Sequence, residues 1–138
     1  MVVEVSDPAI LFFGAPQLST SVHQDFSGQI TSGQPARAGE IIHLYGSGFG
    51  PVTPPVPGGV SAPAGTLSWT VNPVTCGGLD ASGNTIPLKV LFAGLAPAMT
   101  GTYQLDVQLP RSLPTGSTVQ VRCGVGSNNG SIMLPVDQ

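Results

Sequence analysis

The sequence contains very little charge. Asp, Glu, Lys and Arg make up 8% of its 138 residues, whereas ordinary soluble domains contain roughly a quarter. Nucleic acids and anionic membrane surfaces are bound by clustered lysine and arginine side chains. The only fixed cations here are well separated in the sequence, at Arg37, Lys89, Arg111 and Arg122. We therefore expect no nucleic-acid partner and no membrane insertion.

Helical periodicity, long apolar runs and metal-ligand spacing are also missing. No segment keeps the apolar period of a helix for three turns, and no apolar run is long enough to cross a bilayer. His23 and His43 stand far from each other and from both cysteines, so no set of metal ligands has a usual spacing. We expect no metal and no cofactor.

Glycine, proline and short apolar segments are abundant instead. The chain has 19 Gly and 14 Pro, yet 41% of its residues are hydrophobic, which is enough apolar surface to offset the entropy lost on folding. Apolar and polar residues alternate in short segments bounded by Gly, Pro, Asn or Asp, the pattern of an all-β sandwich. We predict one domain over residues 1–138, with strands near 2–5, 9–13, 20–24, 41–46, 66–76, 86–93, 102–109, 118–126 and 131–136.

Three connections between these strands have clear signals. The segment 50–65 contains five of the prolines and is expected to be an extended surface loop, because proline cannot donate to a strand ladder. The segment 80–84, DASGN, is predicted to be a hairpin tip rather than a calcium loop, since it lacks enough carboxylates. Asn129-Gly130 is the favoured type I′ turn sequence and is predicted to join the last two strands.

Cys76 and Cys123 each lie on the apolar side of a predicted strand. Cys123 alternates with Val121 and Val125, and Cys76 shares a side with Val74. Two such cysteines can pair across a sandwich, where the long loop closed would give about 4 kcal/mol in the chain-entropy model. We predict a disulfide formed in an oxidising compartment. Two buried free thiols are the alternative.

Tyr103 opens the alternating strand at 102–109. It follows a Leu-x-Pro turn, which is typical of a tyrosine corner, where the hydroxyl bonds back to the preceding loop. We expect Tyr103 to have a structural role.

Two segments resemble a known family. Residues 39–57 read GEIIHLYGSGFGPVTPPVP, and residues 90–117 read VLFAGLAPAMTGTYQLDVQLPRSLPTGS. Together they resemble the Solibacter-type C-terminal domain, an uncharacterised module at the ends of predicted secreted proteins of acidobacteria. The resemblance covers about residues 22–136 and leaves 1–21 as an N-terminal strand segment. The first segment also resembles the strand and glycine corner of IPT/TIG domains.

This resemblance implies an immunoglobulin-like β-sandwich, here of about seven to nine mostly antiparallel strands. The family brings no catalytic residues to this chain. Its members lack a fixed cysteine pair and have a polar residue where this chain has Trp69. The disulfide and any role of Trp69 therefore depend on this chain alone.

No pattern of catalytic residues is present. Gly46, Gly48 and Gly50 follow a strand, but a dinucleotide-binding loop needs a wider spacing and a helix after it. We interpret the three glycines as a structural corner. His43 is expected at the surface or at a sheet edge, and His23, near Asp25, fits a solvated turn better than a catalytic site. We expect the protein not to be an enzyme.

Trp69 and Tyr45 are the candidate ligand-binding residues. Exposed aromatic rings beside amide side chains are typical of sites that bind sugars. Trp69 shares its side of the strand with Leu67 and Val71, which favours burial. An exposed Trp69 would instead favour carbohydrate binding.

We expect a non-catalytic extracellular accessory, interaction or anchoring module of a larger secreted bacterial protein. Glu4 and Asp7 stand where a signal peptide would have Lys or Arg, so a signal is expected upstream in a longer parent. One alternative is a carbohydrate-binding module; another is a self-assembling fibre or surface-layer subunit. In the latter, the apolar segment 9–13 would add to a neighbour's sheet edge. The expected partners are thus a polysaccharide, neighbouring modules or further copies.

Overall fold

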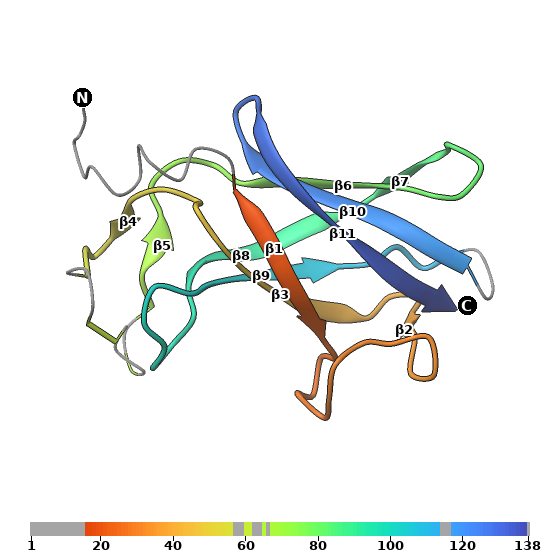
Figure 1. The fold of residues 1–138 in the computed structure, drawn as a ribbon, viewed down its shortest axis with the longest axis horizontal. Helices are drawn as coiled ribbons and strands as arrows, with labels where there is room; N and C mark the ends of the chain where they lie inside the picture. Colours follow the sequence, from red (N-terminus) through yellow and green to blue (C-terminus); the bar gives the residue numbers. More distant parts are fainter. Residues whose placement is uncertain (1–15, 57–59, 62–64, 66, 114–116, 138) are drawn as a thin grey trace.

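The fold is an all-β sandwich. The computed structural model describes residues 16–56, 60–61, 65, 67–113 and 117–137. This part of the chain contains no helix and forms eleven strands in two sheets (Figure 1). The predicted strands 2–5 and 9–13 lie outside the described residues.

Six strands form the first sheet, in the order β1-β3-β9-β8-β5-β4, and all neighbours are antiparallel. Their bounds are β1 Gln17–Val22, β3 Ile41–Ser47, β9 Tyr103–Gln108, β8 Lys89–Leu95, β5 Trp69–Thr70 and β4 Val52–Thr53.

Five strands form the second sheet, in the order β2-β11-β10-β6-β7. Only the pair of β2 and β11 is parallel among the strand pairs of the described chain. The bounds are β2 Ala36–Arg37, β11 Asn128–Asp137, β10 Ser117–Val125, β6 Thr75–Leu79 and β7 Thr85–Pro87.

This strand order is immunoglobulin-like, as predicted. Strands β1, β3, β9 and β8 occupy the places of A, B, E and D, and β6, β10 and β11 those of C, F and G. β7 extends the second sheet beside β6, as a C′ strand does. The strand number exceeds the expected seven to nine because four of the eleven, β2, β4, β5 and β7, have only two or three residues.

The core lies between the sheets and is formed by the inward residues of the alternating strands. Each buried leucine or valine side chain contributes about 1.5–3 kcal/mol relative to exposure. The residues that the long strands bury include Ile42, Leu44, Leu105, Val107, Val119, Val121, Leu134 and Val136.

Two predicted strands are each divided between the sheets. The segment 66–76 contains β5 in the first sheet and the start of β6 in the second, with Asn72 and Pro73 in the connection. The segment 86–93 contains the end of β7 and most of β8, which also lie in different sheets. Pro87 ends β7, because its nitrogen cannot donate to a ladder. Apolar patterning alone therefore overlooked both sheet changes.

The disulfide Cys76–Cys123 is formed, but it does not cross the sandwich. The two residues face each other on the neighbouring strands β6 and β10, with their Cα atoms 4.1 Å apart. The expectation of a bond between the sheets is wrong, because β6 and β10 pair within the second sheet. Cys123 is fully buried and Cys76 packs against the same core.

The hairpin between β10 and β11 turns three residues earlier than predicted. Val125 pairs with Asn128, so the turn residues are Gly126 and Ser127, and Gly126 has a φ of 60°. Glycine at the first central position suits a type II′ turn. Gly130 instead lies under the start of β1, where a Cβ atom would be 2.3 Å from the carbonyl oxygen of Pro16.

The tip at 80–84 is a hairpin connection, as predicted. It joins β6 to β7, and the Asp80 Oδ1 atom accepts hydrogen bonds from the backbone N–H groups of Ser82 and Asn84. Gly83 adopts a φ of 85°, a conformation that glycine reaches without steric cost.

Gly48 and Gly50 form the predicted corner after β3, whereas Gly46 lies within β3 and packs against β1. A Cβ atom on Gly46 would lie 2.1 Å from the carbonyl oxygen of Gln17, and Gly48 and Gly50 have φ angles of 83° and 91°. The Tyr103 hydroxyl donates to the carbonyl of Gly50 in this corner. We expected the hydroxyl to bond to the loop that directly precedes Tyr103 in the chain. Tyr103 instead connects the start of β9 to the corner after β3.

Candidate functional site

The two candidate ligand-binding residues lie in one cross-strand row on the outer side of the first sheet. Tyr45 on β3 pairs with Gln104 on β9, Gln104 with Gly94 on β8, and Gly94 with Trp69 on β5. Adjacent strands are about 4.8 Å apart, so the row extends over about 14 Å. We call these four residues the aromatic row.

Trp69 is exposed, so the prediction that it is buried is wrong. Its exposed fraction is 47%, and Leu67 and Val71 beside it are exposed as well. The polar residue between them points inward instead: Ser68 is buried, and its hydroxyl donates to the carbonyl of Pro54 at 2.8 Å. Strand β5, which lies between β8 and the edge strand β4, therefore presents its apolar side to solvent.

A buried phenylalanine supports the Trp69 ring. The ring of Phe92 meets that of Trp69 edge-on, with centroids 4.7 Å apart and an interplanar angle of 75°. This arrangement is favourable for aromatic pairs. Gly94 makes room for it, because a Cβ atom there would lie 2.7 Å from the tip of Phe92. The tryptophan ring is thus exposed and held in a defined orientation.

Polar groups complete the aromatic row at its other end. The Gln104 Nε2 atom donates to Asp106 Oδ1 at 2.9 Å, and the Ser19 hydroxyl donates to the carbonyl of Tyr45 at 3.0 Å. Partial burial, and after it the charge of Asp106, raises the pKa of Tyr45 above its usual value. The Tyr45 phenol is therefore a neutral donor at physiological pH.

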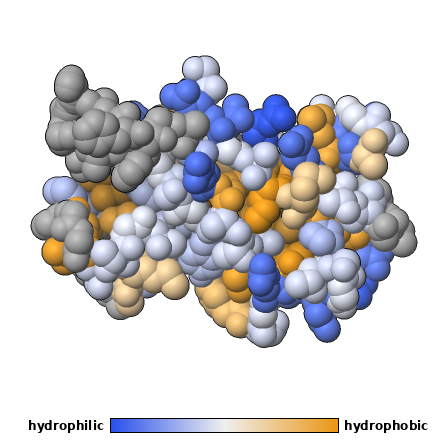
Figure 2. All heavy atoms as spheres, in the orientation of Figure 1, coloured by the Kyte–Doolittle hydropathy of each residue, from blue (hydrophilic) through white to orange (hydrophobic). Residues whose placement is uncertain are grey.

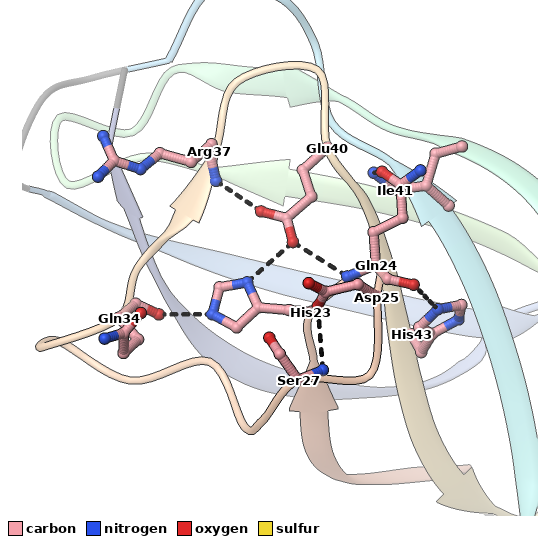
Figure 3. A network of polar contacts seen from close by, with 9 residues as sticks. All are labelled: His23, Gln24, Asp25, Ser27, Gln34, Arg37, Glu40, Ile41 and His43. Carbon is pink, nitrogen blue, oxygen red and sulfur yellow. Dashed lines mark hydrogen bonds and ion pairs between the residues drawn. The ribbon is translucent and has the colours of Figure 1, made fainter.

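Beside this row, residues 23–40 form a network of polar contacts, which we call the histidine loop (Figure 3). His23 Nδ1 lies 2.8 Å from Glu40 Oε2, and His23 Nε2 lies 2.9 Å from the carbonyl oxygen of Gln34. Asp25, the expected neighbour of His23, instead accepts hydrogen bonds from Ser27. Glu40 lies in the turn before β3, and its carboxylate accepts hydrogen bonds from the backbone N–H groups of Arg37 and Gln24.

Glu40 accepts several hydrogen bonds. Burial raises the pKa of Glu40, but bonds from the backbone of Arg37, the ring of His23 and the backbone of Gln24 outweigh this and leave the pKa below its usual value. Glu40 is therefore an ionised carboxylate at physiological pH.

His43 is buried, so the expectation of a surface or sheet-edge position is wrong. It lies on β3, between β1 and β9, and 7% of it is exposed. Its Nδ1 atom is 2.7 Å from Asp106 Oδ1, and its Nε2 atom is 3.1 Å from the carbonyl oxygen of Gln24. The ring of Phe26 stacks on it, with centroids 4.0 Å apart and planes 10° apart. The histidine loop thus covers the outward side chain of β3.

The histidine loop borders an open hollow of about 530 Å³, lined by His23, Gln24, Asp25, Gln34, Arg37 and Glu40 among others. The pair of His23 and Glu40 has the types of an acid–base dyad. General-base catalysis also needs a ring nitrogen directed at a nucleophile or water. Both Nε2 atoms, of His23 and of His43, are directed at backbone carbonyls. This geometry favours a structural network.

No three His, Cys, Asp or Glu side chains among the described residues are placed to hold a metal ion. In the same part of the chain, no helix is long and apolar enough to cross a membrane.

Several of the large exposed apolar side chains lie on β5 and on the loops beside it. Figure 2 shows hydrophobic spheres at the left end of the face drawn, where Figure 1 labels β4 and β5. Ser61 and Thr100 form a bridge there, which brings together two loops with exposed apolar residues. The large exposed side chains of these segments are Val60, Leu67, Trp69, Val71 and Met99.

Compared with protein-family models, with curated proteins and with solved structures, the chain matches none of them.

Proposed function

We propose that this protein is a non-catalytic extracellular module that binds a polysaccharide through the aromatic row. The observation that carries the proposal is the exposure of Trp69 on a rigid support. Sugar rings stack their apolar faces on aromatic rings, and their hydroxyls need donors and acceptors beside the ring. Gln104, Tyr45 and Asp106 supply such groups within reach of an extended chain of sugars.

The low charge of the protein agrees with a neutral ligand. With 8% charged residues, little Coulomb attraction is available for a strongly charged partner. The Cys76–Cys123 disulfide supports an oxidising, extracellular compartment. The module would attach a larger secreted protein to its substrate or surface, and its bacterial origin rests on the resemblance of two sequence segments.

A glycan and polysaccharide binding screen tests this proposal. We expect binding that Trp69→Ala removes, by tenfold or more, in a protein that remains folded. Tyr45→Phe and Gln104→Ala should each weaken the same binding. Met133→Ala is the matched control, since Met133 is 57% exposed and lies on the second sheet. Binding that both Trp69→Ala and Met133→Ala leave unchanged would place the ligand elsewhere.

A second candidate function is docking of a neighbouring protein module. The cluster of exposed apolar side chains around β5 favours it, because such patches mark interaction surfaces. If no glycan binds and Trp69→Ala weakens association with the parent protein's adjacent module, this second candidate is preferred. Self-assembly through the segment 9–13 stays a prediction, and large assemblies in a sizing measurement would support it.

A further inference from the structure

A further aromatic ring is exposed beside the aromatic row. Phe26 lies in the histidine loop, and 57% of it is exposed. Its ring stacks on that of His43, with centroids 4.0 Å apart, so the face turned away from the imidazole is in contact with solvent. His43 is an outward residue of β3, two positions before Tyr45. Phe26 therefore lies over the same side of the first sheet as the aromatic row.

Phe26 and Trp69 are each supported by a buried ring of one neighbouring cross-strand row. His43 on β3 pairs with Asp106 on β9, and Asp106 pairs with Phe92 on β8. Phe26 stacks on His43 at one end of this row, and Trp69 meets Phe92 at the other end. The two supports are two strand spacings apart, about 10 Å, with Asp106 on the strand between them.

Asp106 offers a hydrogen-bond acceptor between the two rings. Its Oδ1 atom lies 2.7 Å from His43 Nδ1 and accepts from Gln104 Nε2 at 2.9 Å. Within the part of the chain that the structure describes, its Oδ2 atom has no hydrogen-bond partner, and 24% of its side chain is exposed. Burial, and after it the charge of Asp106, raises the pKa of the nearby Tyr45 phenol, which stays a donor. An acceptor and a donor for sugar hydroxyls thus lie beside the rings.

The backbone at Phe26 indicates a role beyond folding. Its φ of 58° costs a residue with a Cβ atom about 1–2 kcal/mol, and Asn or Gly adopts this conformation more readily. The stacking on His43 offsets part of this cost, but more than half of Phe26 remains exposed. Strained residues are concentrated where a protein meets its ligands. A strained, exposed ring therefore suits a binding surface better than a core.

The histidine loop holds Phe26 in place. The N–H group of Phe26 donates to the carbonyl of His23 at 2.9 Å, and that of His23 donates to the carbonyl of Gly28 at 3.0 Å. Beyond this turn, Ile30 is buried in the core, and its N–H group donates to the carbonyl of Ser21 on β1 at 2.9 Å. The ring is thus ordered before a ligand binds, which lowers the entropic cost of binding.

We propose that Phe26 and Trp69 are two stacking platforms of one glycan site, with Asp106 between them, and that the ligand is an extended β-linked polysaccharide that contacts both. This inference rests on the proposed function and names its ligand class. One sugar ring is too short to stack on both platforms, so several consecutive sugars bind. Equatorially linked β-chains are straight ribbons, whereas α-linked glucans coil. A straight ribbon matches two rings held along one cross-strand row.

The length of the ligand tests this site. Isothermal titration calorimetry of the wild-type protein compares cellohexaose, mannohexaose, xylohexaose and chitohexaose, each with its disaccharide. We expect at least one hexasaccharide to bind tenfold or more tightly than its disaccharide, because only the longer chain reaches both rings. Maltohexaose has the same length but α-linkages, and it should bind at least tenfold more weakly than the best β-linked chain. Equal affinity for long and short β-chains, or preference for maltohexaose, would overturn the inference.

Variants of Phe26 separate a ligand contact from a structural role. Phe26→Asn removes the ring and suits the left-handed backbone, whereas Phe26→Tyr keeps the ring. Phe26→Asn should weaken hexasaccharide binding by about threefold to tenfold, as expected for one aromatic contact, and leave the disaccharide at Trp69 unaffected. Phe26→Tyr and the control Met133→Ala should bind both ligands as the wild type does. Equal weakening of both ligands by Phe26→Asn, or none, would overturn the inference.

Nuclear Overhauser effects in the wild-type complex decide the question even if a variant fails to fold. Protons of the bound hexasaccharide should contact the ring protons of both Phe26 and Trp69. If they contact Trp69 alone, or if only an α-linked glycan binds, the proposed function stands and the site with two platforms is wrong. If the wild-type protein binds no glycan at all, the proposed function fails and this inference fails with it.

Discussion

At the scale of single residues, several glycines allow contacts that no side chain would permit. Gly46, Gly94 and Gly130 each lie against a backbone carbonyl oxygen that a Cβ atom would approach to 2.1–2.3 Å. These contacts bring β1 onto β3, the segment before β5 onto β8, and the start of β1 onto β11. The glycine-rich composition is thus required for packing as well as for turns.

Gly46→Ala should destabilise the protein strongly. The added methyl would overlap the carbonyl of Gln17, and separating β1 from β3 to relieve this would cost about 1–3 kcal/mol or more. Gly77→Ala is the matched control: Gly77 is also a strand residue, but a Cβ atom there meets no atom within 4 Å. Urea unfolding at pH 7 measures both. Equal stability of the two variants would contradict the close contact.

Tyr103→Phe should remove the hydrogen bond to the Gly50 carbonyl while keeping the ring that packs against Phe49, with centroids 5.7 Å apart. We expect a loss of about 1 kcal/mol in the free energy of unfolding. Circular dichroism during urea unfolding provides the measurement. An unchanged midpoint would mean that the hydroxyl does not stabilise the corner.

At the scale of elements, alternation predicted the long strands well. The expected segments 41–46, 102–109 and 118–126 correspond to β3, β9 and β10 within one residue at each end, because one face of each strand is buried. Alternation did not predict that the chain changes sheets after β5 and after β7, since both sheets bury the same apolar types. It also assigned Trp69 to the core, although the buried residue is Ser68, which directly precedes β5.

The disulfide joins two strands within one sheet and should contribute to stability. In the chain-entropy model the 47-residue separation corresponds to about 4 kcal/mol. Cys76→Ala with Cys123→Ala should therefore lower the free energy of unfolding by an amount of this order. Intact mass with and without reductant should differ by two hydrogens. An identical mass under both conditions would exclude the bond.

The turn before β3 should depend on the charge of Glu40. Its pKa is lowered in the folded protein, so its contribution to stability is present above the usual carboxyl pKa of about 4.3 and is lost as the pH falls through the lowered value. Glu40→Gln should be less stable than the parent at pH 7, with a smaller difference at pH 3. Urea unfolding at the two pH values measures this, and a constant difference would contradict the assignment.

At the scale of the whole molecule, the candidate site could be predicted only in part. Trp69 and Tyr45 were identifiable as aromatic residues in a chain with few of them, but their common row depends on the pairing of four strands. The two histidine–carboxylate pairs join residues 17 and 63 positions apart, and no local pattern reports such pairing. The polar side of β3 and β9 was the available signal, since it places His43 and Asp106 outward.

The two sheets share one core, which predicts that they unfold together. The buried cluster contains residues of both sheets, including Leu44 and Leu105 from the first and Val121 and Leu134 from the second. Neither sheet can lose its partner without exposing this surface, so urea unfolding should be two-state. Far-UV circular dichroism and Trp69 fluorescence should give the same midpoint.

Trp69 fluorescence is a strict test of two-state unfolding, because Trp69 lies on β5, a two-residue strand near the sheet edge. An earlier fluorescence transition would mean that β4 and β5 open independently, and the support of Phe92 for the Trp69 ring would then be transient.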